Sequence, residues 1–292
     1  MAVPIGTKYT YYPGCSQTKT SRAYDISGRN VARALGLELV DLEDWNCCGA
    51  SNYIAIDARK AFVLSARNLA LAEKTGRPDI VTSCSGCYVI LAKAKKYIKQ
   101  NPKLREDINQ ALATDNLTYS GQVNVRHILD VLVNDAGEER VRDAVTTSLA
   151  GLKVAPYYGC QIGRPYGEFD DEEWPHTLDD IVSWTGAEPV NFPLKSKCCG
   201  GILMTTQPQV GRTLVGKLLK SAKDAGADCI VTSCSLCHIT LESYQKKVSR
   251  HLGEDVNIPV LYFTQLVGRA LGLTPKELML KDSLTHAEAV LP

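Results

Sequence analysis

The sequence predicts an α/β protein with two similar halves, each containing a small parallel sheet. Short apolar segments alternate along the chain with longer segments whose apolar residues recur at helical spacing, which is typical of parallel α/β packing. A Ser-Cys-x-x-Cys sequence follows a short apolar segment at residues 83–87 and again at residues 233–237. We therefore expect two tandem, pseudo-symmetric α/β domains, residues 1–150 and residues 151–292, the second ending in a helical tail.

The first half is predicted to alternate strands and helices up to a closing helix. Gly36 ends one helical segment, and Gly76 with Pro78 ends another. The segment 124–133 has apolar residues at helical spacing and is predicted to close the domain as a helix. The predicted strands are 8–12, 37–42 and 80–82, and the other predicted helices are 21–35, 57–74, 86–100 and 101–116.

The second half repeats this plan and adds an acidic insertion at residues 168–173. The segment 260–271 corresponds to the closing helix of the first half, and the helical tail begins at Thr274. Sites in parallel α/β sheets gather at the carboxyl ends of the strands, so cysteines that follow the strands are expected at one sheet edge. The predicted strands are 153–158, 188–192 and 229–232, and the other predicted helices are 178–185, 209–225 and 236–248.

Composition and charge exclude several classes of function. The 292 residues carry a net charge of +1, which gives no reason to expect a nucleic-acid partner. No apolar run approaches the ~20 residues of a membrane span, and residues 1–10 contain no apolar signal core. We therefore expect a cytoplasmic location, where thiols stay reduced and the 11 cysteines are metal ligands or redox thiols.

Ten of the 11 cysteines follow one pattern that occurs twice. The first half reads C-x31-CC-x35-C-x2-C, and the second half reads C-x37-CC-x34-C-x2-C. The remaining cysteine, Cys229, lies within a predicted strand and is expected to be a buried small apolar residue. The first set is Cys15, Cys47, Cys48, Cys84 and Cys87, and the second set is Cys160, Cys198, Cys199, Cys234 and Cys237.

The number and spacing of these thiols favour an iron–sulfur cluster in each half. Thiolates select zinc, Cu(I) or iron–sulfur clusters, and a structural zinc ion takes four ligands, one fewer than each set offers. Side chains of consecutive residues in extended backbone point apart, so an adjacent Cys-Cys pair is suited to two different irons of a larger, open cluster. A zinc site in one half, and thiol–disulfide exchange through the Cys-x-x-Cys pairs, remain alternatives.

The doubled pattern, with Cys-Cys-Gly at residues 47–49 and 198–200, resembles the cysteine-rich "CCG" domain family. From Tyr11 to about Leu273, two such domains in one chain look like the B subunit of the soluble heterodisulfide reductases of methanogenic archaea. The same domain pair occurs in glycolate oxidase iron–sulfur subunits, lactate-utilisation proteins and sulfite-reductase-associated subunits. Both cysteine sets are complete here, and the ferredoxin run C-x2-C-x2-C-x3-C-P is absent from the sequence, which favours the resemblance to the B subunit.

The resemblance implies a function, cofactors and partners. Each five-cysteine set would hold a noncubane [4Fe–4S] cluster, and the two clusters would face each other across the domain interface. They would reduce the coenzyme M–coenzyme B heterodisulfide to two thiols. Electrons would come from a ferredoxin-like [4Fe–4S] protein (the C type of partner) and a flavin-containing protein (the A type of partner), with a hydrogenase or formate dehydrogenase as a further candidate partner. A non-catalytic electron-transfer subunit of another dehydrogenase or reductase complex is the alternative.

Other candidate residues lie near the cysteines. Arg164, Lys195 and Lys197 could neutralise the anionic groups of the coenzymes, or could be solvated surface charges. His238 follows Cys237 and could donate a proton to a product thiolate, or could be a packing residue.

Two glycines and two further histidines complete the candidates. Gly14 and Gly159 precede the first cysteine of each set and are expected to let the backbone pass close to a cluster. His127 and His176 have no sequence neighbours that single them out for function.

Overall fold

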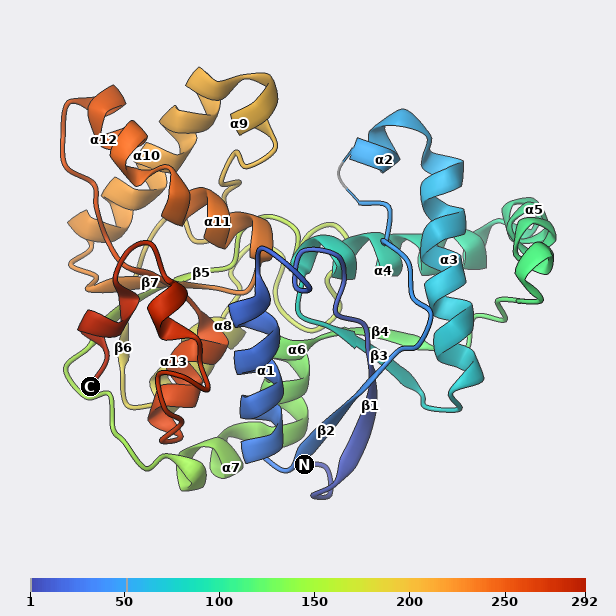
Figure 1. Ribbon diagram of the computed structural model, residues 1–292, viewed down its shortest axis with the longest axis horizontal. Helices are drawn as coiled ribbons and strands as arrows, with labels where there is room; N and C mark the ends of the chain where they lie inside the picture. Colours follow the sequence, from blue (N-terminus) through green and yellow to red (C-terminus); the bar gives the residue numbers. More distant parts are fainter. Residues whose placement is uncertain (1, 51) are drawn as a thin grey trace.

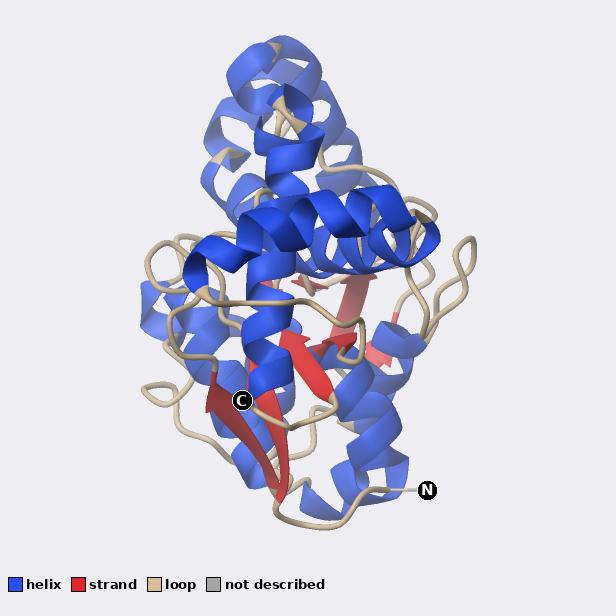
Figure 2. Ribbon diagram, turned by 90° about the vertical axis from the view of Figure 1, so that its right-hand side faces the viewer, coloured by secondary structure: helices blue, strands red, loops and turns tan. Residues whose placement is uncertain are grey.

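The computed structural model describes residues 2–50 and 52–292, and within them it contains two four-stranded parallel sheets. The strand order is β2-β1-β3-β4 in the first sheet and β6-β5-β7-β8 in the second, so both halves have the same topology. Figure 2 shows helices on both sides of the strands, as a parallel sheet requires. The strands are β1 Thr7–Tyr11, β2 Leu37–Asp41, β3 Asp79–Thr82, β4 Asn124–His127, β5 Lys153–Tyr157, β6 Glu188–Pro189, β7 Cys229–Thr232 and β8 Val260–Tyr262.

The helices connect the strands and pack against the two sheets (Figure 1). Two of them begin directly after a cysteine: α4 follows Cys84 and α11 follows Cys234. In the first half the helices are α1 Arg22–Ala34, α2 Asn52–Ile56, α3 Ala58–Lys74, α4 Ser85–Gln100, α5 Pro102–Leu112, α6 Ile128–Asp130 and α7 Gly137–Ala144. In the second half they are α8 Thr177–Trp184, α9 Leu203–Thr206, α10 Pro208–Asp224, α11 Ser235–Ser243, α12 Gln245–Leu252 and α13 Phe263–Ala270. Short 3₁₀ or π segments are η1 Ala113–Asp115, η2 Val131–Ala136, η3 Leu280–Asp282 and η4 Ala287–Val290.

The predicted α/β class with two matching parallel sheets is confirmed, but the last strand of each sheet lies where the sequence predicts a helix. The prediction is wrong for β4, which pairs with β3, and for β8, which pairs with β7. Each of these strands passes into a helix without a turn, so the apolar residues of strand and helix form one continuous run in the sequence. The predicted strand 188–192 is shorter than expected and covers only Glu188–Pro189. The predicted helix 236–248 is interrupted at Tyr244, between α11 and α12. The predicted helical tail contains, within the described residues, only the 3₁₀ segments η3 and η4.

One hydrophobic core cluster spans both halves, and each half also has a cluster of its own. Figure 1 shows α1 and α13 lying side by side between the two sheets. The ring of Tyr24 on α1 stacks on Tyr262 at a centroid distance of 4.3 Å, and the hydroxyls of Ser27 and Thr264 lie 2.6 Å apart in the same buried interface. The two halves are therefore joined by a buried interface with both aromatic and hydrogen-bonding contacts.

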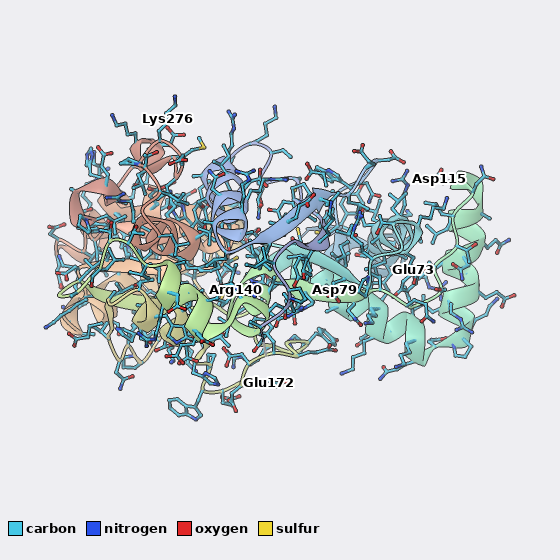
Figure 3. All side chains as sticks on the ribbon, turned by 90° about the horizontal axis from the view of Figure 1, so that it is seen from below. Glu73, Asp79, Asp115, Arg140, Glu172 and Lys276 are labelled. Carbon is cyan, nitrogen blue, oxygen red and sulfur yellow. The ribbon has the colours of Figure 1, made fainter. Side chains whose placement is uncertain are left out.

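Charged side chains are distributed over the surface. Figure 3 labels Glu172 in the acidic insertion and Lys276 in the C-terminal tail, and both are exposed. No helix within residues 2–50 and 52–292 combines the length and apolar character needed to cross a membrane.

Candidate functional site

The first cysteine set comes together at the carboxyl edge of the first sheet. The loop after β1 carries Cys15, the loop after β2 carries Cys47 and Cys48, and the loop after β3 runs through Cys84 into α4. The Cys47 and Cys15 sulfurs lie 4.0 Å apart, and the Cys48 and Cys87 sulfurs lie 3.4 Å apart. The adjacent cysteines therefore contact different partners, one at the exposed side of the site and the other in its buried part.

The second set repeats this arrangement at the edge of the second sheet. Cys198 interacts with Cys160, Cys199 interacts with Cys237, and the two adjacent cysteines also interact with each other. Cys198 is exposed, whereas Cys199 and Cys237 are buried. Within the described residues, no three His, Cys, Asp or Glu side chains are arranged to hold a single metal ion.

The crowded thiols shift one another's pKa in the same directions in both sets. Interaction with the Cys15 thiol lowers the pKa of Cys47 to about 2, and interaction with Cys160 lowers the pKa of Cys198 to about 2. The neighbouring Cys48 has its pKa raised to about 12, first by Cys47. Each site can therefore present a thiolate beside thiols that resist ionisation, because several like charges cannot share so small a volume.

The pKa of one thiol in the first set is also shifted by a residue of the second half of the protein. Interaction with Cys87 lowers the pKa of Cys84 to about 6, against the effect of burial, and the Ser235 hydroxyl acts in the same direction. Cys234 likewise has its pKa lowered, first by Cys237, while the charge of Cys84 opposes this shift. The two sets are therefore close enough to interact.

Glycine residues hold the two sites in matching geometry. Gly14 has a φ of +76°, and a Cβ atom there would lie 2.9 Å from the sulfur of Cys87. Gly159 has a φ of +71°, and its Cβ would lie 3.0 Å from the sulfur of Cys237. Glycine thus permits both the backbone conformation and the close approach to a thiol.

A buried tyrosine supports the loop before each Cys-Cys pair. The Tyr12 hydroxyl donates a hydrogen bond of 2.9 Å to the carbonyl oxygen of Asn46, and the Tyr157 hydroxyl donates one of 2.7 Å to that of Lys197. Because these carbonyls immediately precede Cys47 and Cys198, the tyrosines fix where the two pairs begin.

Two adjoining cavities contain the cysteine sets. A cavity of about 320 Å³ is lined by all five cysteines of the first set, and one of about 60 Å³ is lined by all five of the second set. Gln161, Cys234 and Leu236 line both cavities. The two cysteine sets therefore lie on either side of a common wall.

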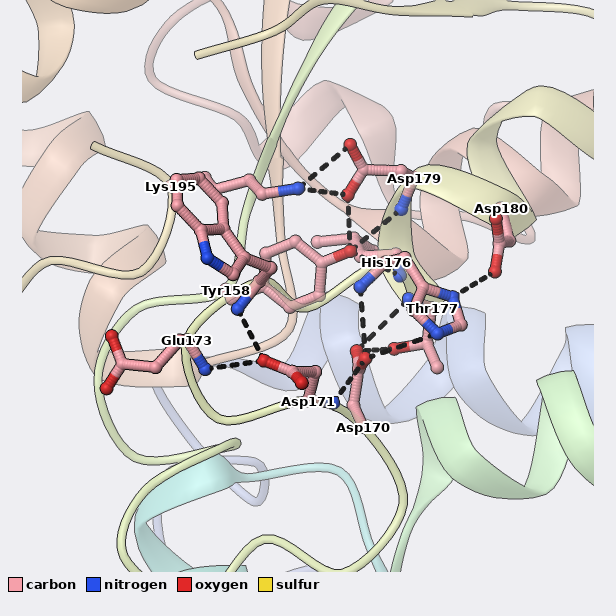
Figure 4. Close-up of polar contacts among 11 residues, drawn as sticks. Tyr158, Asp170, Asp171, Glu173, His176, Thr177, Asp179, Asp180 and Lys195 are labelled. Carbon is pink, nitrogen blue, oxygen red and sulfur yellow. Dashed lines mark hydrogen bonds and ion pairs between the residues drawn. The ribbon is translucent and has the colours of Figure 1, made fainter. Parts of the chain in front are cut away.

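The predicted cationic residues lie outside both cavity linings. Lys195 forms an ion pair of 3.1 Å with Asp179, which also accepts a hydrogen bond from the Tyr158 hydroxyl (Figure 4). Arg164 donates a hydrogen bond of 2.7 Å to the carbonyl oxygen of Ser196. Lys197 is exposed. The role of these residues in anion binding stays a prediction.

The histidines occupy different environments. His238 is buried, stacks on Tyr262 at 3.8 Å between ring centroids, and lines a third cavity with Glu242. Burial lowers the pKa of His238 to about 3, so its ring is neutral. His176 is exposed and lies 2.6 Å from Asp180, whose interaction raises the pKa of His176 (Figure 4). His238 as a proton donor stays a prediction.

Sequence reasoning does not single out His127 or Gln161. His127 Nδ1 accepts a hydrogen bond of 3.1 Å from the Leu129 amide, so Nε2 carries the proton and donates to the carbonyl oxygen of Ser83 at 3.0 Å. This bond supports the loop just before Cys84. Gln161 directly follows a cysteine, which is its only sequence signal, and its position between the cavities depends on how the halves pack.

Cys229 is completely buried in β7, as expected for a small apolar residue. Burial raises the pKa of its thiol to about 12.

Comparisons with known proteins agree with the duplicated architecture. The model of the cysteine-rich (CCG) domain matches residues 9–92 and 154–242. A crystal structure of a hypothetical protein from Helicobacter pylori has the same fold, with a TM-score of 0.76 and 16% identity. The similarity covers 98% of this chain and 54% of the Helicobacter chain, so this chain spans about half of that protein.

Curated relatives match almost the entire chain. The 8-methylmenaquinol:fumarate reductase membrane anchor subunit of Wolinella succinogenes is 33% identical over 96% of this chain and 98% of its own. The B subunit of the ferredoxin:CoB-CoM heterodisulfide reductase of Methanosarcina mazei is 31% identical over 94% of this chain and 93% of its own. A protein of Archaeoglobus profundus described as similar to the heterodisulfide reductase B subunit is 32% identical over 92% of each chain. The chain therefore belongs to the cysteine-rich (CCG) domain family, among two-domain members that include the B subunits of heterodisulfide reductases.

Proposed function

We propose that this chain is the iron–sulfur subunit of a reductase complex and that it reduces the coenzyme M–coenzyme B heterodisulfide to two thiols. The observation that carries the proposal is the common wall of Gln161, Cys234 and Leu236 between the two cysteine-lined cavities. Because Cys234 of the second set also lines the first cavity, a small molecule in that cavity can contact both cysteine sets. The similarity to the B subunits of heterodisulfide reductases supports the same substrate class.

The chemistry of the donor set fits iron–sulfur clusters. Each set offers five thiols, two of which have a lowered pKa, and thiolates are the ligands that hold such clusters. In the first set Cys47 contacts Cys15 while Cys48 contacts Cys87, so the adjacent pair can bind two different irons. We assign one noncubane [4Fe–4S] cluster to each set, with all five cysteines as ligands.

Two such clusters would supply the two electrons that the disulfide bond accepts, and two protons complete the thiols. The chain's own residues position the substrate and limit the access of water. In the first cavity Leu236 and Ile239 provide apolar surface, and Thr20 and Ser21 add hydroxyl groups to the lining. Arg164, Lys195, Lys197 and His238 are the predicted anion-binding and proton-donating residues outside these linings.

The proposal includes partners and a location. Electrons would arrive through a ferredoxin-like partner of the C type, supplied by a flavin-containing partner of the A type, with a hydrogenase or formate dehydrogenase as a further donor. The exposed position of Cys15, Cys47 and Cys198 supports electron entry from a docked protein. We propose that the complex works in the cytoplasm.

A second function is an electron relay without a substrate of its own, in another reductase complex. The similarity to the fumarate reductase subunit of Wolinella favours it. A relay needs no substrate space beside its cysteines, whereas the first cavity extends beyond them to Thr20, Ser21 and Ile239. This extension favours the catalytic function.

Metal analysis and an activity assay test the proposal. Anaerobically purified protein should contain about eight iron atoms and as many acid-labile sulfides per chain, without zinc. About four irons with about one zinc would mean that one half is a structural zinc site. With an artificial one-electron donor, the protein should reduce the heterodisulfide; a fully loaded protein that does not would be a relay.

A further inference from the structure

Two serines at equivalent positions have different surroundings. Ser85 follows Cys84, and Ser235 follows Cys234, each as the first residue of a helix. The Ser85 hydroxyl donates a hydrogen bond of 3.0 Å to the carbonyl oxygen of Ser233 across the interface. Within the described residues, the Ser235 hydroxyl has no partner in hydrogen-bond geometry, although only 2% of the residue is exposed.

Ser235 lies beside the cysteine set of the other half. Ser235 lines the first cavity together with Cys84, and its hydroxyl acts to lower the pKa of the Cys84 thiol. The equivalent hydroxyl of Ser85 is already bonded to the Ser233 carbonyl, so it is not free to donate to Cys234. A buried hydroxyl without an oxygen or nitrogen acceptor loses hydrogen-bond energy unless the neighbouring sulfur accepts its proton.

We propose that Ser235 donates a hydrogen bond to the Cys84 thiolate and so raises the reduction potential of the cluster held by the first cysteine set above that of the second. The inference rests on the proposed function, since it requires clusters at both sets. A hydrogen bond to a cluster sulfur stabilises the additional negative charge of the reduced state, and such bonds are among the factors that set cluster potentials. The two sites are then matched in ligands but unequal in potential, and an electron shared between them favours the first site.

Redox titration of the loaded protein, followed by electron paramagnetic resonance, tests this assignment. The first site is isolated by Cys198→Ala with Cys199→Ala, which leaves the loop containing Ser235 in place. In this background Ser235→Ala should shift the midpoint potential of the remaining signal to a lower value. The matched control is Ser85→Ala, which removes the equivalent hydroxyl and should leave that potential unchanged.

The second site is isolated by Cys47→Ala with Cys48→Ala, and there Ser235→Ala should cause no shift. Unchanged potential of the first site, or equal shifts in both backgrounds, would overturn the inference. If Ser235→Ala loses iron, Ser235→Thr and Ser235→Val replace it, because they have nearly the same shape and only threonine keeps the hydroxyl. A first-site potential that is higher in Ser235→Thr than in Ser235→Val supports the inference, and equal potentials in the two variants reject it. Absence of clusters from the wild-type protein would instead contradict the proposed function.

Discussion

The hydroxyl of Tyr24, on α1 in the first half, donates a hydrogen bond of 3.0 Å to the carbonyl oxygen of Ser233 in the second half. Ser233 immediately precedes Cys234, and its carbonyl also accepts the hydrogen bond from Ser85. The loop that presents Cys234 is therefore held partly by residues of the other domain. This contact links the packing of the two halves to the geometry of the cysteine sites.

Tyr24→Phe should lower the stability of the protein by about 1 kcal/mol, because it removes one buried hydrogen bond and leaves the ring in place. The midpoint of urea denaturation of the anaerobically purified protein measures the loss. Tyr166→Phe is the control, since the Tyr166 hydroxyl lies at the exposed surface, 3.4 Å from that of Tyr97. Equal midpoints for Tyr24→Phe and the wild type would show that the bond contributes nothing to stability.

Gly14→Ala should reduce the iron bound by the first set, and Gly159→Ala should reduce that bound by the second. Each new Cβ would lie within about 3.0 Å of a cysteine sulfur, so the thiol must move. The positive φ adds a strain of about 1–2 kcal/mol. Iron content and the paramagnetic signal of each site measure the effect.

Gly76→Ala separates the two causes. Gly76 has a φ of +70°, and no atom lies within 4 Å of the position that a Cβ would take there, so the substitution adds strain without crowding a thiol. Iron content should stay at the wild-type value. If all three alanine variants lose iron equally, general destabilisation rather than contact with the thiol is responsible.

Cys199→Ser should disturb the second cluster and leave the first intact, with a loss of up to about half of the iron. The reason is that Cys198 interacts with Cys160 whereas Cys199 interacts with Cys237, and the two cysteines are proposed to bind different irons. Iron counting combined with paramagnetic resonance measures the outcome. Cys229→Ser is the control, because Cys229 lies in β7 and lines neither cavity. This variant should keep the full iron content of the wild-type protein. Unchanged iron and unchanged disulfide reduction in Cys199→Ser would exclude Cys199 as a ligand.

Both cysteine sets should be required for turnover. Cys84→Ala with Cys87→Ala, and separately Cys234→Ala with Cys237→Ala, should each abolish reduction of the heterodisulfide by an artificial one-electron donor. The expected loss is mainly in kcat, because each site is proposed to stabilise one sulfur as the bond breaks. The artificial donor removes the need for partner docking. A folded variant that lacks one cluster but retains near-normal turnover would refute the shared site.

The sequence by itself determined the elements that depend on local pattern. Strand–helix alternation predicted the parallel sheets, and the doubled cysteine spacing predicted two equivalent sites at strand ends. It could not separate β4 from α6 or β8 from α13, because a strand that continues into a helix without a turn has no boundary signal. Hydrophobic periodicity requires several residues, and strands of three or four residues are too short to display it.

Only the tertiary structure decided how the two sites differ and where they meet. Ser85 and Ser235 are equivalent in sequence, yet the Ser85 hydroxyl donates to a carbonyl oxygen whereas the buried Ser235 hydroxyl has no such partner within the described residues and lines the first cavity with Cys84. Gln161 lines both cavities because α1 and α13 pack the halves together in one orientation. These relationships join residues far apart in the chain, and they depend on the packing of two complete domains, which no local sequence pattern encodes.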